Sequence, residues 1–227
     1  MKMPKYGIER MINSALVCKR KSTAKKRHYV GASSLGDCCD RKIWYTRFEP
    51  AEIKDGRILR IFEIGDLIEA YVIQLLKYAG TQVFEKDAKG EQFGFSDNGV
   101  SGHLDGVVVG LPESSKPHVL EIKSMKHSNF LQLQKKGLKA AQIKYYAQMQ
   151  IYMLKMELEN GLMIVMNKDT QELYFERIKL DKLYAKALVK KGQDINKMEV
   201  PPPRAWKKPN FNCNMCNHKK ECWNDER

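Results

Sequence analysis

The chain has 227 residues, and 43% of them are hydrophobic, so it can bury the core of one domain with some elaboration. It carries 40 lysine and arginine residues against 27 aspartate and glutamate residues, which gives a formal net charge of +13 at pH 7. A positive charge of this size favours a polyanionic partner. The sequence has no apolar run of about 18 residues and no apolar signal-peptide core near its start, so we expect neither a membrane span nor export. Nucleic acid is therefore the expected partner.

Six cysteines occupy positions 18, 38, 39, 213, 216 and 222. In a chain of this length without an export signal, an even number of cysteines does not indicate a disulfide framework. Their clustered spacing is typical of metal ligands instead. We therefore expect reduced thiols and a cytoplasmic, reducing compartment.

The N-terminal segment is basic. Its run CKRKSTAKKRHY (18–29) favours either an arm that contacts phosphates or a solvated stretch, and we weigh the two equally. After it, Ser33 or Ser34 is expected to cap a helix that begins near Leu35 and contains Arg41.

A long helix is predicted from Gly56 to Tyr78, and Gly80 is placed to end it. Its apolar residues recur at steps of three and four, which predicts that one face of the helix is buried. They are Ile61, Ile64, Leu67, Ile68, Tyr71, Val72, Leu75 and Leu76. Glu69 lies among them, and its carboxylate is either at the rim of this face, which the periodicity favours, or an additional metal ligand.

From Thr81 onward the apolar residues alternate, which predicts strands separated by Gly, Asn-Gly and Pro-rich turns. A helical pattern then returns, with an interruption near Gly137 and an end near Gly161. The expected elements are strands over 81–86, 91–96, 100–109 and 118–124, a helix over 131–161, a strand hairpin over 162–179 and a helix over 180–195. This succession predicts an α/β domain in which helices flank a mixed sheet.

The chemistry is concentrated in two strands near the middle of this order. Asp105 stands at the head of the apolar run GVVV, and Glu121 and Lys123 lie in HVLEIKSM after a polar turn. Because side chains alternate along a strand, Glu121 and Lys123 project from the same face. The pair is either an exposed edge with cross-strand charge pairs or, as we favour, a site where Asp105 and Glu121 hold a divalent metal beside Lys123.

The helix after these strands carries a polar stripe. Lys144, Gln148 and Tyr152 follow one another at four-residue steps and therefore share one face. Such a stripe is either an ordinary solvent face or a surface that faces substrate. Its position directly after the acidic strand favours the second interpretation.

The C-terminal tail begins with three consecutive prolines, which predict an extended connector. Cys213, Cys216 and Cys222 follow, and a tetrahedral zinc or a cubane iron–sulfur cluster would need a fourth ligand. His218 supplies one within the tail. Cys38 or Cys39 would supply one from the other end of the chain and so close a loop of more than about 170 residues.

Together these residues resemble a known family. The segments GHLDG (102–106), EIK (121–123) and QMQIY (148–152) resemble the RecB-like branch of the PD-(D/E)xK nucleases, and the flanking cysteines resemble its iron–sulfur-containing members, among them CRISPR-associated exonucleases and AddB-type nuclease domains. The resemblance covers roughly residues 30–223. It implies a single nuclease domain over residues 1–227, with a basic segment to about 30, a core over about 31–200 and a connector and cysteine tail after about 201.

The implied fold is a restriction-endonuclease-like mixed sheet flanked by helices, with the two ends of the chain joined by a cysteine-ligated cluster. The segment SSLGDCCDRKIWY matches the start of the family's pattern and selects Cys39 over Cys38. The implied [4Fe–4S] ligands, with zinc as the alternative metal, are Cys39, Cys213, Cys216 and Cys222.

The resemblance also implies roles for the other residues. The catalytic residues are Asp105, Glu121, Lys123, Gln148 and Tyr152, the Mg²⁺ or Mn²⁺ ligands are Glu69, Asp105, Glu121 and Ile122, and the DNA contacts are Arg41 and Lys144. Where some members have a histidine after the helix glycine this chain has Asp66, and Glu69 is preferred to it as the helical ligand. The implied activity is metal-dependent hydrolysis of DNA, as an exonuclease on ends or single strands. The alternatives are an endonuclease of the same fold in recombination or repair, and a non-catalytic DNA-binding protein with a structural cluster.

Overall fold

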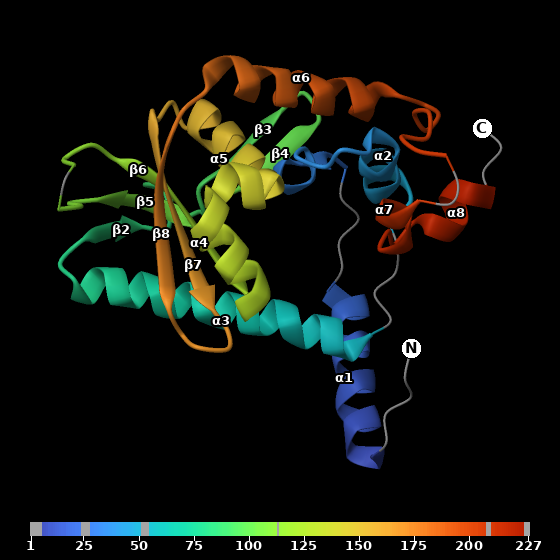
Figure 1. The fold of residues 1–227 in the computed structure, drawn as a ribbon, viewed down its shortest axis with the longest axis horizontal. Coiled ribbons are helices and arrows are strands. Elements are labelled where there is room, and N and C mark those ends of the chain that lie inside the picture. The colour runs from blue at the N-terminus through green and yellow to red at the C-terminus, as the bar shows by residue number, and fades with distance from the viewer. Residues whose placement is uncertain (1–5, 24–27, 51–54, 113, 208–209, 225–227) are drawn as a thin grey trace.

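The computed structural model describes residues 6–23, 28–50, 55–112, 114–207 and 210–224 (Figure 1). Part of the basic run, residues 24–27, lies outside the described residues. The helices are α1 (Gly7–Thr23), α2 (Asp40–Phe48), α3 (Gly56–Tyr78), α4 (His127–Ala141), α5 (Ile143–Lys155), α6 (Lys182–Lys197), α7 (Phe211–Asn214) and α8 (Lys219–Asn224), with a 3₁₀ turn η1 (Ala32–Ser34). The strands are β1 (Val30–Gly31), β2 (Gln82–Phe84), β3 (Gly94–Asp97), β4 (Val100–His103), β5 (Gly106–Val109), β6 (His118–Met125), β7 (Asn160–Asn167) and β8 (Leu173–Lys179). Within these ranges, no helix is long and apolar enough to cross a bilayer.

Two sheets form the centre of the molecule. The larger has the order β2-β5-β6-β7-β8, in which β6 and β7 run parallel and the other neighbours are antiparallel. The smaller has the order β1-β4-β3. The predicted mixed sheet and the predicted hairpin of β7 and β8 are therefore confirmed, and β6, which carries the acid–lysine pair, is the middle strand of the larger sheet.

Helices cover both faces of the larger sheet (Figure 1). The alternation predicted for β6 is confirmed, because Val119 packs in one hydrophobic cluster with residues of α5, whereas Leu120 and Ile122 pack in a second cluster with Val72 of α3. Glu121 and Lys123 share the parity of Val119, so strand geometry directs them toward the α5 side.

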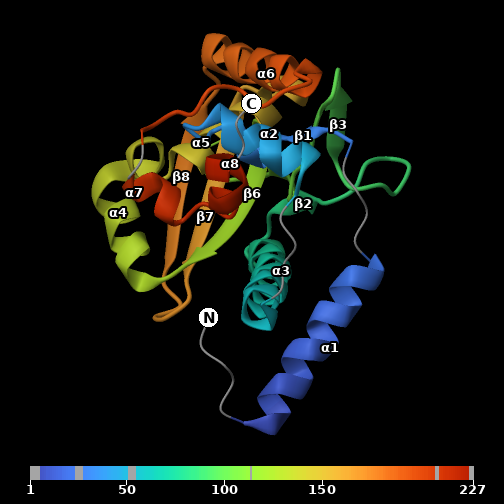
Figure 2. The same cartoon turned by 90° about the vertical axis from the view of Figure 1, so that its right-hand side faces the viewer.

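The long helix was predicted correctly, but its packing was not. α3 spans Gly56–Tyr78, and Gly80 ends it with a positive φ of 85°. Several residues of its apolar stripe are nevertheless exposed, at Ile61 (42%), Ile64 (48%), Leu67 (65%) and Tyr71 (53%). The reason is that the first half of α3 extends beyond the larger sheet, where α1 lies across it (Figures 1 and 2).

The strand predicted over 100–109 is wrong as a single element. β4 ends at His103 and β5 begins at Gly106, and the two strands belong to different sheets. The alternating pattern continues through Leu104 and Asp105, so periodicity gives no sign of the break. Its consequence is that Asp105 lies at the corner where the chain passes from one sheet to the other.

Two predicted helix boundaries are also wrong. The helix expected near Leu35 begins at Asp40 instead, after η1, and its N-cap residue Cys39 makes no side-chain capping bond within the described chain. The helix expected to end near Gly161 ends at Lys155, and Gly161 belongs to β7, where a Cβ would lie 2.7 Å from Met149 Cε. The predicted interruption at Gly137 is confirmed by its φ of 72°.

Candidate active site and cysteine cavity

The edge of β6 is open where the acidic residues lie. β5 pairs with β6 only through Gly106–Val108, opposite Leu120–His118, so in the described chain β6 from Glu121 onward pairs with β7 alone. The carboxylate of Asp105 occupies the vacated position and accepts a 2.7 Å hydrogen bond from the backbone N–H of Ile122. Because β5 begins only at Gly106, the Asp105 carboxylate lies beside the backbone of β6.

Glu121 and Lys123 meet at this edge. The Glu121 side chain is fully buried, and Lys123 Nζ lies 2.5 Å from its Oε1 and 3.8 Å from Asp105 Oδ2. Lys123 Nζ also donates to the backbone carbonyl of Ile122 at 2.9 Å. The structure therefore brings the predicted Asp105, Glu121, Ile122 and Lys123 together in one cluster.

α5 completes the surroundings of Glu121. Gln148 Nε2 donates to Glu121 Oε1 at 2.8 Å and to the Tyr152 hydroxyl oxygen at 3.0 Å. Glu121 Oε1 is thus held by both Gln148 and Lys123, whereas Glu121 Oε2 is buried without a hydrogen-bond partner among the described residues. An orphaned, buried carboxylate oxygen is costly unless a cation or donor reaches it.

Electrostatics set the protonation of the metal-free site. Burial raises the pKa of Glu121 to about 8, with Lys123 opposing and Asp105 adding to the rise. Burial also raises the pKa of Asp105. Burial lowers the pKa of Lys123, but the charges of Glu121 and Asp105 outweigh that effect and leave it above its ordinary value. Without a metal, the cluster therefore holds more protons than the same carboxyl groups would in water.

Glu69 belongs electrostatically to the same cluster. It is partly buried on α3, and burial, followed by the charge of Asp105, raises its pKa to about 7. Asp66, one helical turn earlier, is exposed. The charge of Asp66 also raises the pKa of Asp105, so both acidic residues of this part of α3 act electrostatically on the acidic edge of β6, and Glu69 as the helical ligand stays a prediction.

Sequence reasoning missed one aromatic residue of the site. Lys123 Nζ lies 6.0 Å from the centre of the Tyr145 ring, a cation–π distance, and the ring is partly buried. Tyr145 precedes Gln148 by three positions, so it falls on the same side of α5. That spacing was visible in the sequence and could have indicated it.

The oxygen atoms of the cluster suit a hard divalent cation. Among the described residues, no three His, Cys, Asp or Glu side chains could hold a metal ion as they stand. Mg²⁺ does not require three, because it is commonly bound by one or two carboxylates together with waters and substrate phosphates. The carboxylates of Asp105 and Glu121 and the backbone carbonyl of Ile122 fit such a site. Within Glu121, Oε2 is the oxygen that has no partner among the described residues.

Close packing beside Tyr152 makes a testable prediction. A Cβ at Gly102 of β4 would lie 2.7 Å from Tyr152 Cε1 and 2.9 Å from Ala32 Cβ. Gly102→Ala should therefore displace the Tyr152 ring and lower the free energy of unfolding by about 1–3 kcal/mol, or the melting temperature by about 3–10 °C. The control is Gly65→Ala in α3, where a Cβ meets no described atom within 4 Å and should stabilise the helix slightly. Equal melting temperatures for wild type and Gly102→Ala would contradict this packing.

The cysteines of both chain ends line a cavity of about 300 Å³. Its lining includes Cys38, Cys39, Cys213, Cys216, Cys222 and His218. Burial raises the pKa of Cys39, and the charges of Asp37 and Cys222 add smaller parts of the rise. The structure thus brings the four predicted ligands to one cavity, although not in an arrangement that would hold a metal as it stands.

His218, the alternative ligand from the tail, lines the same cavity. It is buried, its ring stacks on Tyr45, and its Nε2 is 3.3 Å from Thr46 Oγ1. Its Nδ1 is buried without a hydrogen-bond partner in the described chain. His218 therefore remains a chemically reasonable fourth ligand for a zinc ion.

The two residues predicted to contact DNA differ in exposure. Arg41 is 2% exposed and donates to the carbonyls of Pro201 (3.3 Å) and Pro202 (2.8 Å), so it holds the proline connector against α2. Lys144 is half-exposed and its Nζ lies 2.5 Å from Asp37 Oδ2. Both side chains make contacts within the protein, and neither placement in itself indicates a phosphate contact.

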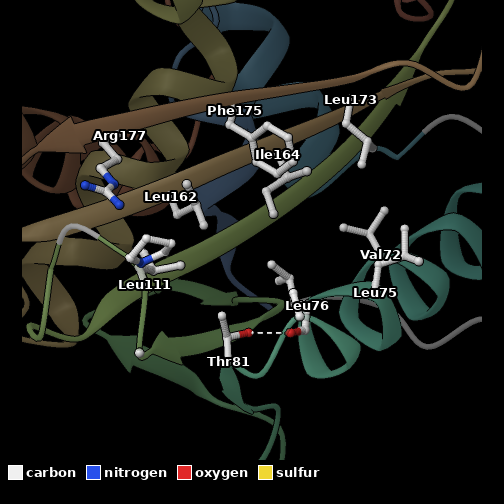
Figure 3. A pocket seen from close by; sticks show the side chains of 13 residues that line it. Val72, Leu75, Leu76, Thr81, Leu111, Leu162, Ile164, Leu173, Phe175 and Arg177 are labelled. Atoms are coloured by element: carbon white, nitrogen blue, oxygen red, sulfur yellow. Dashed lines mark hydrogen bonds between the residues drawn. The ribbon is translucent and has the colours of Figure 1, made fainter.

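A further cavity, of about 630 Å³, lies between the C-terminal half of α3 and the outer face of β7 and β8 (Figure 3). Its lining is mainly apolar, with residues such as Leu76, Ile164 and Phe175, and Arg177 at its border. None of the acidic residues described above lines it. We therefore place the candidate active site at the smaller polar cluster on the edge of β6.

Comparison with known proteins finds no protein-family model that matches this sequence and no match among curated proteins. Solved structures do match. The structure of SSO0001 has a TM-score of 0.56 at 18% identity and covers 96% of this chain and 98% of its own. An alkaline exonuclease from Laribacter hongkongensis, LHK-Exo, has a TM-score of 0.53 at 14% identity over 80% of this chain and 90% of its own, and its complex with dAMP has a TM-score of 0.52 at 15% identity over 82% and 90%. At these identities the likeness establishes the fold, which is a mixed α/β arrangement of helices around mixed sheets, similar to that of nuclease structures.

Proposed function

We propose that this protein is a metal-dependent deoxyribonuclease of the RecB-like PD-(D/E)xK type, which hydrolyses phosphodiester bonds at DNA ends or in single strands. The observation that carries the proposal is the buried carboxylate of Glu121, which has one oxygen held by Gln148 and Lys123 and the other without a partner among the described residues. The free oxygen of a fixed carboxylate can bind a divalent metal, and a neighbouring lysine can contact a phosphate that the metal also binds.

Asp105, Glu121, Glu69 and the carbonyl of Ile122 would hold Mg²⁺ or Mn²⁺. The bound cation would supply a Lewis acid that activates water and offsets the charge that builds on the scissile phosphate. The protonated amine of Lys123 lies between the carboxylates of Asp105 and Glu121. It is placed to orient the attacking water and to stabilise negative charge on the phosphoryl oxygens. Gln148, which also donates to the Tyr152 hydroxyl oxygen, holds Glu121 Oε1 and would leave Oε2 available to the cation.

DNA is the substrate that the charge and the fold favour. The net charge of +13 attracts a polyanion. One of the similar structures is named an alkaline exonuclease and was solved with dAMP, a deoxynucleotide. Action on ends is proposed by this analogy of fold.

The cysteine cavity is proposed to hold a [4Fe–4S] cluster through Cys39, Cys213, Cys216 and Cys222. Four thiols from both ends of the chain around one cavity of about 300 Å³ support this ligand set. The cluster would join the tail to the start of α2, outside the catalytic edge of β6. Zinc held by the three tail cysteines and His218 is the competing assignment, which the orphaned His218 Nδ1 supports.

The activity can be tested with linear and covalently closed circular single-stranded DNA, each incubated with Mg²⁺, Mn²⁺ or EDTA. We expect linear DNA to be degraded only with metal and circular DNA to survive, and 5′- and 3′-labelled strands will give the polarity. Lys123→Met should abolish cleavage but leave the Kd for DNA within about threefold, because the loss is of transition-state stabilisation. Cleavage of the circle would indicate the endonuclease alternative, and DNA binding without metal-dependent cleavage would overturn the proposal in favour of a non-catalytic protein.

A further inference from the structure

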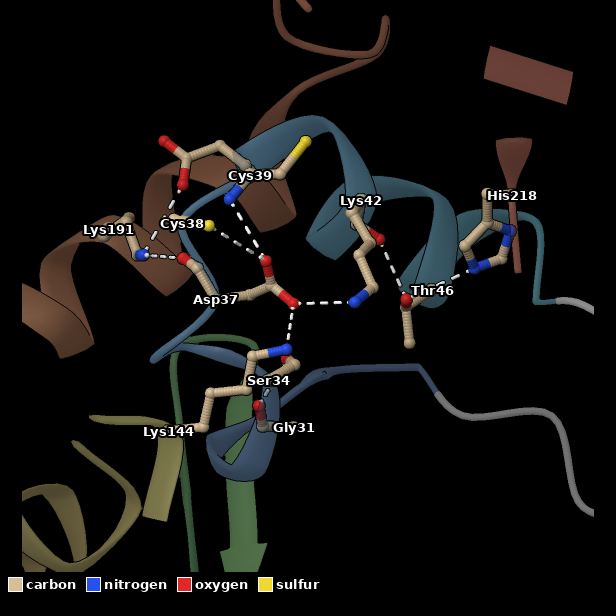
Figure 4. Close-up of polar contacts among 11 residues, drawn as sticks. Gly31, Ser34, Asp37, Cys38, Cys39, Lys42, Thr46, Lys144, Lys191 and His218 are labelled. Atoms are coloured by element: carbon tan, nitrogen blue, oxygen red, sulfur yellow. Dashed lines mark hydrogen bonds and ion pairs between the residues drawn. The ribbon is translucent and has the colours of Figure 1, made fainter. Parts of the chain in front are cut away.

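Asp37 joins several elements through one buried carboxylate. It lies in the loop between η1 and α2 and is 8% exposed. Its Oδ2 is 2.8 Å from Lys42 Nζ of α2 and 2.5 Å from Lys144 Nζ of α5, and its Oδ1 accepts a 3.2 Å hydrogen bond from the backbone N–H of Cys39 (Figure 4). Lys191 of α6 donates to the Asp37 carbonyl at 3.2 Å. One residue thereby connects the cysteine-bearing loop to α5.

The loop also touches the backbone of α5 directly. A Cβ at Gly36 would lie 2.6 Å from Lys144 Cα and 2.8 Å from Ala147 Cβ, so only glycine permits this approach. α5 needs such an anchor, because its N-cap residue Gln142 makes no side-chain capping bond in the described chain. The first turn of α5 is therefore held by the Gly36–Asp37 loop in addition to the backbone hydrogen bonds that Tyr145 and Tyr146 donate to the Gln142 carbonyl.

Lys144, Gln148 and Tyr152 lie on one stripe of α5, at four-residue steps. The stripe is fixed at one end by Asp37 and at the other by Glu121. A side-chain tip lies about 5–6 Å from the axis of a helix, so a rotation of α5 by about 10° would move the Gln148 amide by about 1 Å. That shift would stretch its 2.8 Å bond to Glu121 beyond hydrogen-bonding range.

We propose that Asp37 and Lys144 are positioning residues of the nuclease centre, and that their ion pair sets the rotation of α5 so that Gln148 holds Glu121. The inference rests on the proposed function, and it ties the catalytic geometry to the loop that carries Cys39. It also gives Lys144 a role other than a phosphate contact, since the buried Asp37 carboxylate already engages its charge. Misplacement of a catalytic group by about 1 Å can lower a rate by roughly 100-fold.

The test uses Asp37→Asn, Lys144→Met, the double variant and the conservative Lys144→Arg, with Lys186→Met as the control. Lys186 is exposed on α6, so its substitution removes the same charge at a distance. Rates are measured at saturating Mn²⁺ on a short single-stranded oligonucleotide, with the Kd for DNA measured in EDTA. We expect Asp37→Asn and Lys144→Met each to lower kcat by about 10–100-fold, with the Kd for DNA changed by less than about threefold. The kcat of the double variant should be no lower than that of the poorer single variant. Lys144→Arg should retain most of the wild-type kcat.

The opposite pattern would overturn the inference. If Lys144→Met weakens DNA binding while kcat is kept, and Asp37→Asn behaves as wild type, Lys144 is a phosphate contact. If wild type cleaves no DNA, the proposed nuclease function fails separately, and amide hydrogen exchange over Tyr145–Gln148 then decides the positioning claim. Exchange should be at least tenfold faster in Asp37→Asn and Lys144→Met than in Lys186→Met, and unchanged exchange would contradict it.

Discussion

Glu121→Gln should lower the rate of metal-dependent DNA cleavage by about 10³-fold or more. The substitution keeps the size and the hydrogen bond from Gln148 but removes the negative charge that the cation needs. Loss of a metal-binding charge at a developing phosphoryl charge is worth several kcal/mol, and each 1.36 kcal/mol is a factor of ten in rate. Single-turnover cleavage at saturating Mn²⁺, compared with wild type, measures the effect.

The same substitution should not weaken the metal-free fold at high pH. Burial raises the folded-state pKa of Glu121 to about 8 from an ordinary value of 4.5, so folding favours the protonated form. The stability that Glu121 contributes is then complete below about pH 4.5 and is lost as the pH rises through about 8. In EDTA, wild type and Glu121→Gln should melt alike near pH 5, and the variant should melt at the higher temperature at pH 8.5.

Glu159→Gln is the matched control, because Glu159 is 74% exposed in a surface ion pair with Lys116. It should change neither cleavage nor the pH dependence of melting. A Glu121→Gln variant that cleaves at the wild-type rate would remove Glu121 from the site. A variant that melts below wild type at pH 8.5 would show that the ion pair with Lys123 outweighs the cost of burying the carboxylate.

The central part of this site follows from local pattern. Alternation along a strand places Glu121 and Lys123 on one face of β6 and Leu120 on the other, because the strand repeat of two is independent of the rest of the fold. A turn between two apolar runs likewise predicts the hairpin of β5 and β6 that brings Asp105 to the pair. For the same reason α3 was predicted with its correct ends, since its periodicity and its terminal glycine are local signals.

The remaining features depend on contacts between distant segments. Asp37 and Lys144 are 107 positions apart, and neither has a neighbour in sequence that indicates the other. The proline connector, 160 positions after Arg41, returns across α2 and accepts a hydrogen bond from the Arg41 side chain, a contact that no residue near Arg41 in the sequence indicates. The corner at Asp105 exists because β4 and β5 belong to different sheets. The alternating pattern of apolar residues gives no sign of this change of sheet. These positions are decided by which elements pack together, and a single sequence carries no local signal for that.

Cys39→Ser should remove the metal proposed for the cysteine cavity and lower the melting temperature by about 10–20 °C. A cluster ligated by Cys39 and the tail closes a loop of about 170 residues, which in the chain-entropy description is worth about 5 kcal/mol. In a chain of this length, 1 kcal/mol corresponds to about 2–4 °C in melting temperature. Metal content by elemental analysis, the visible absorbance of the purified protein and thermal melting give three independent readouts.

Cys38→Ser is the closest available control, because Cys38 is adjacent in sequence, lines the same cavity and is exposed, with its sulfur 3.9 Å from Asp37 Oδ1. It should leave metal content and melting unchanged. His218→Asn separates the two assignments of the metal. A zinc ion held within the tail needs His218 and does not need Cys39, so it would survive Cys39→Ser and be lost from His218→Asn. A cluster that joins the two ends of the chain gives the reverse, and in that case α2, the proline connector and the tail fold as one unit whose stability depends on the metal.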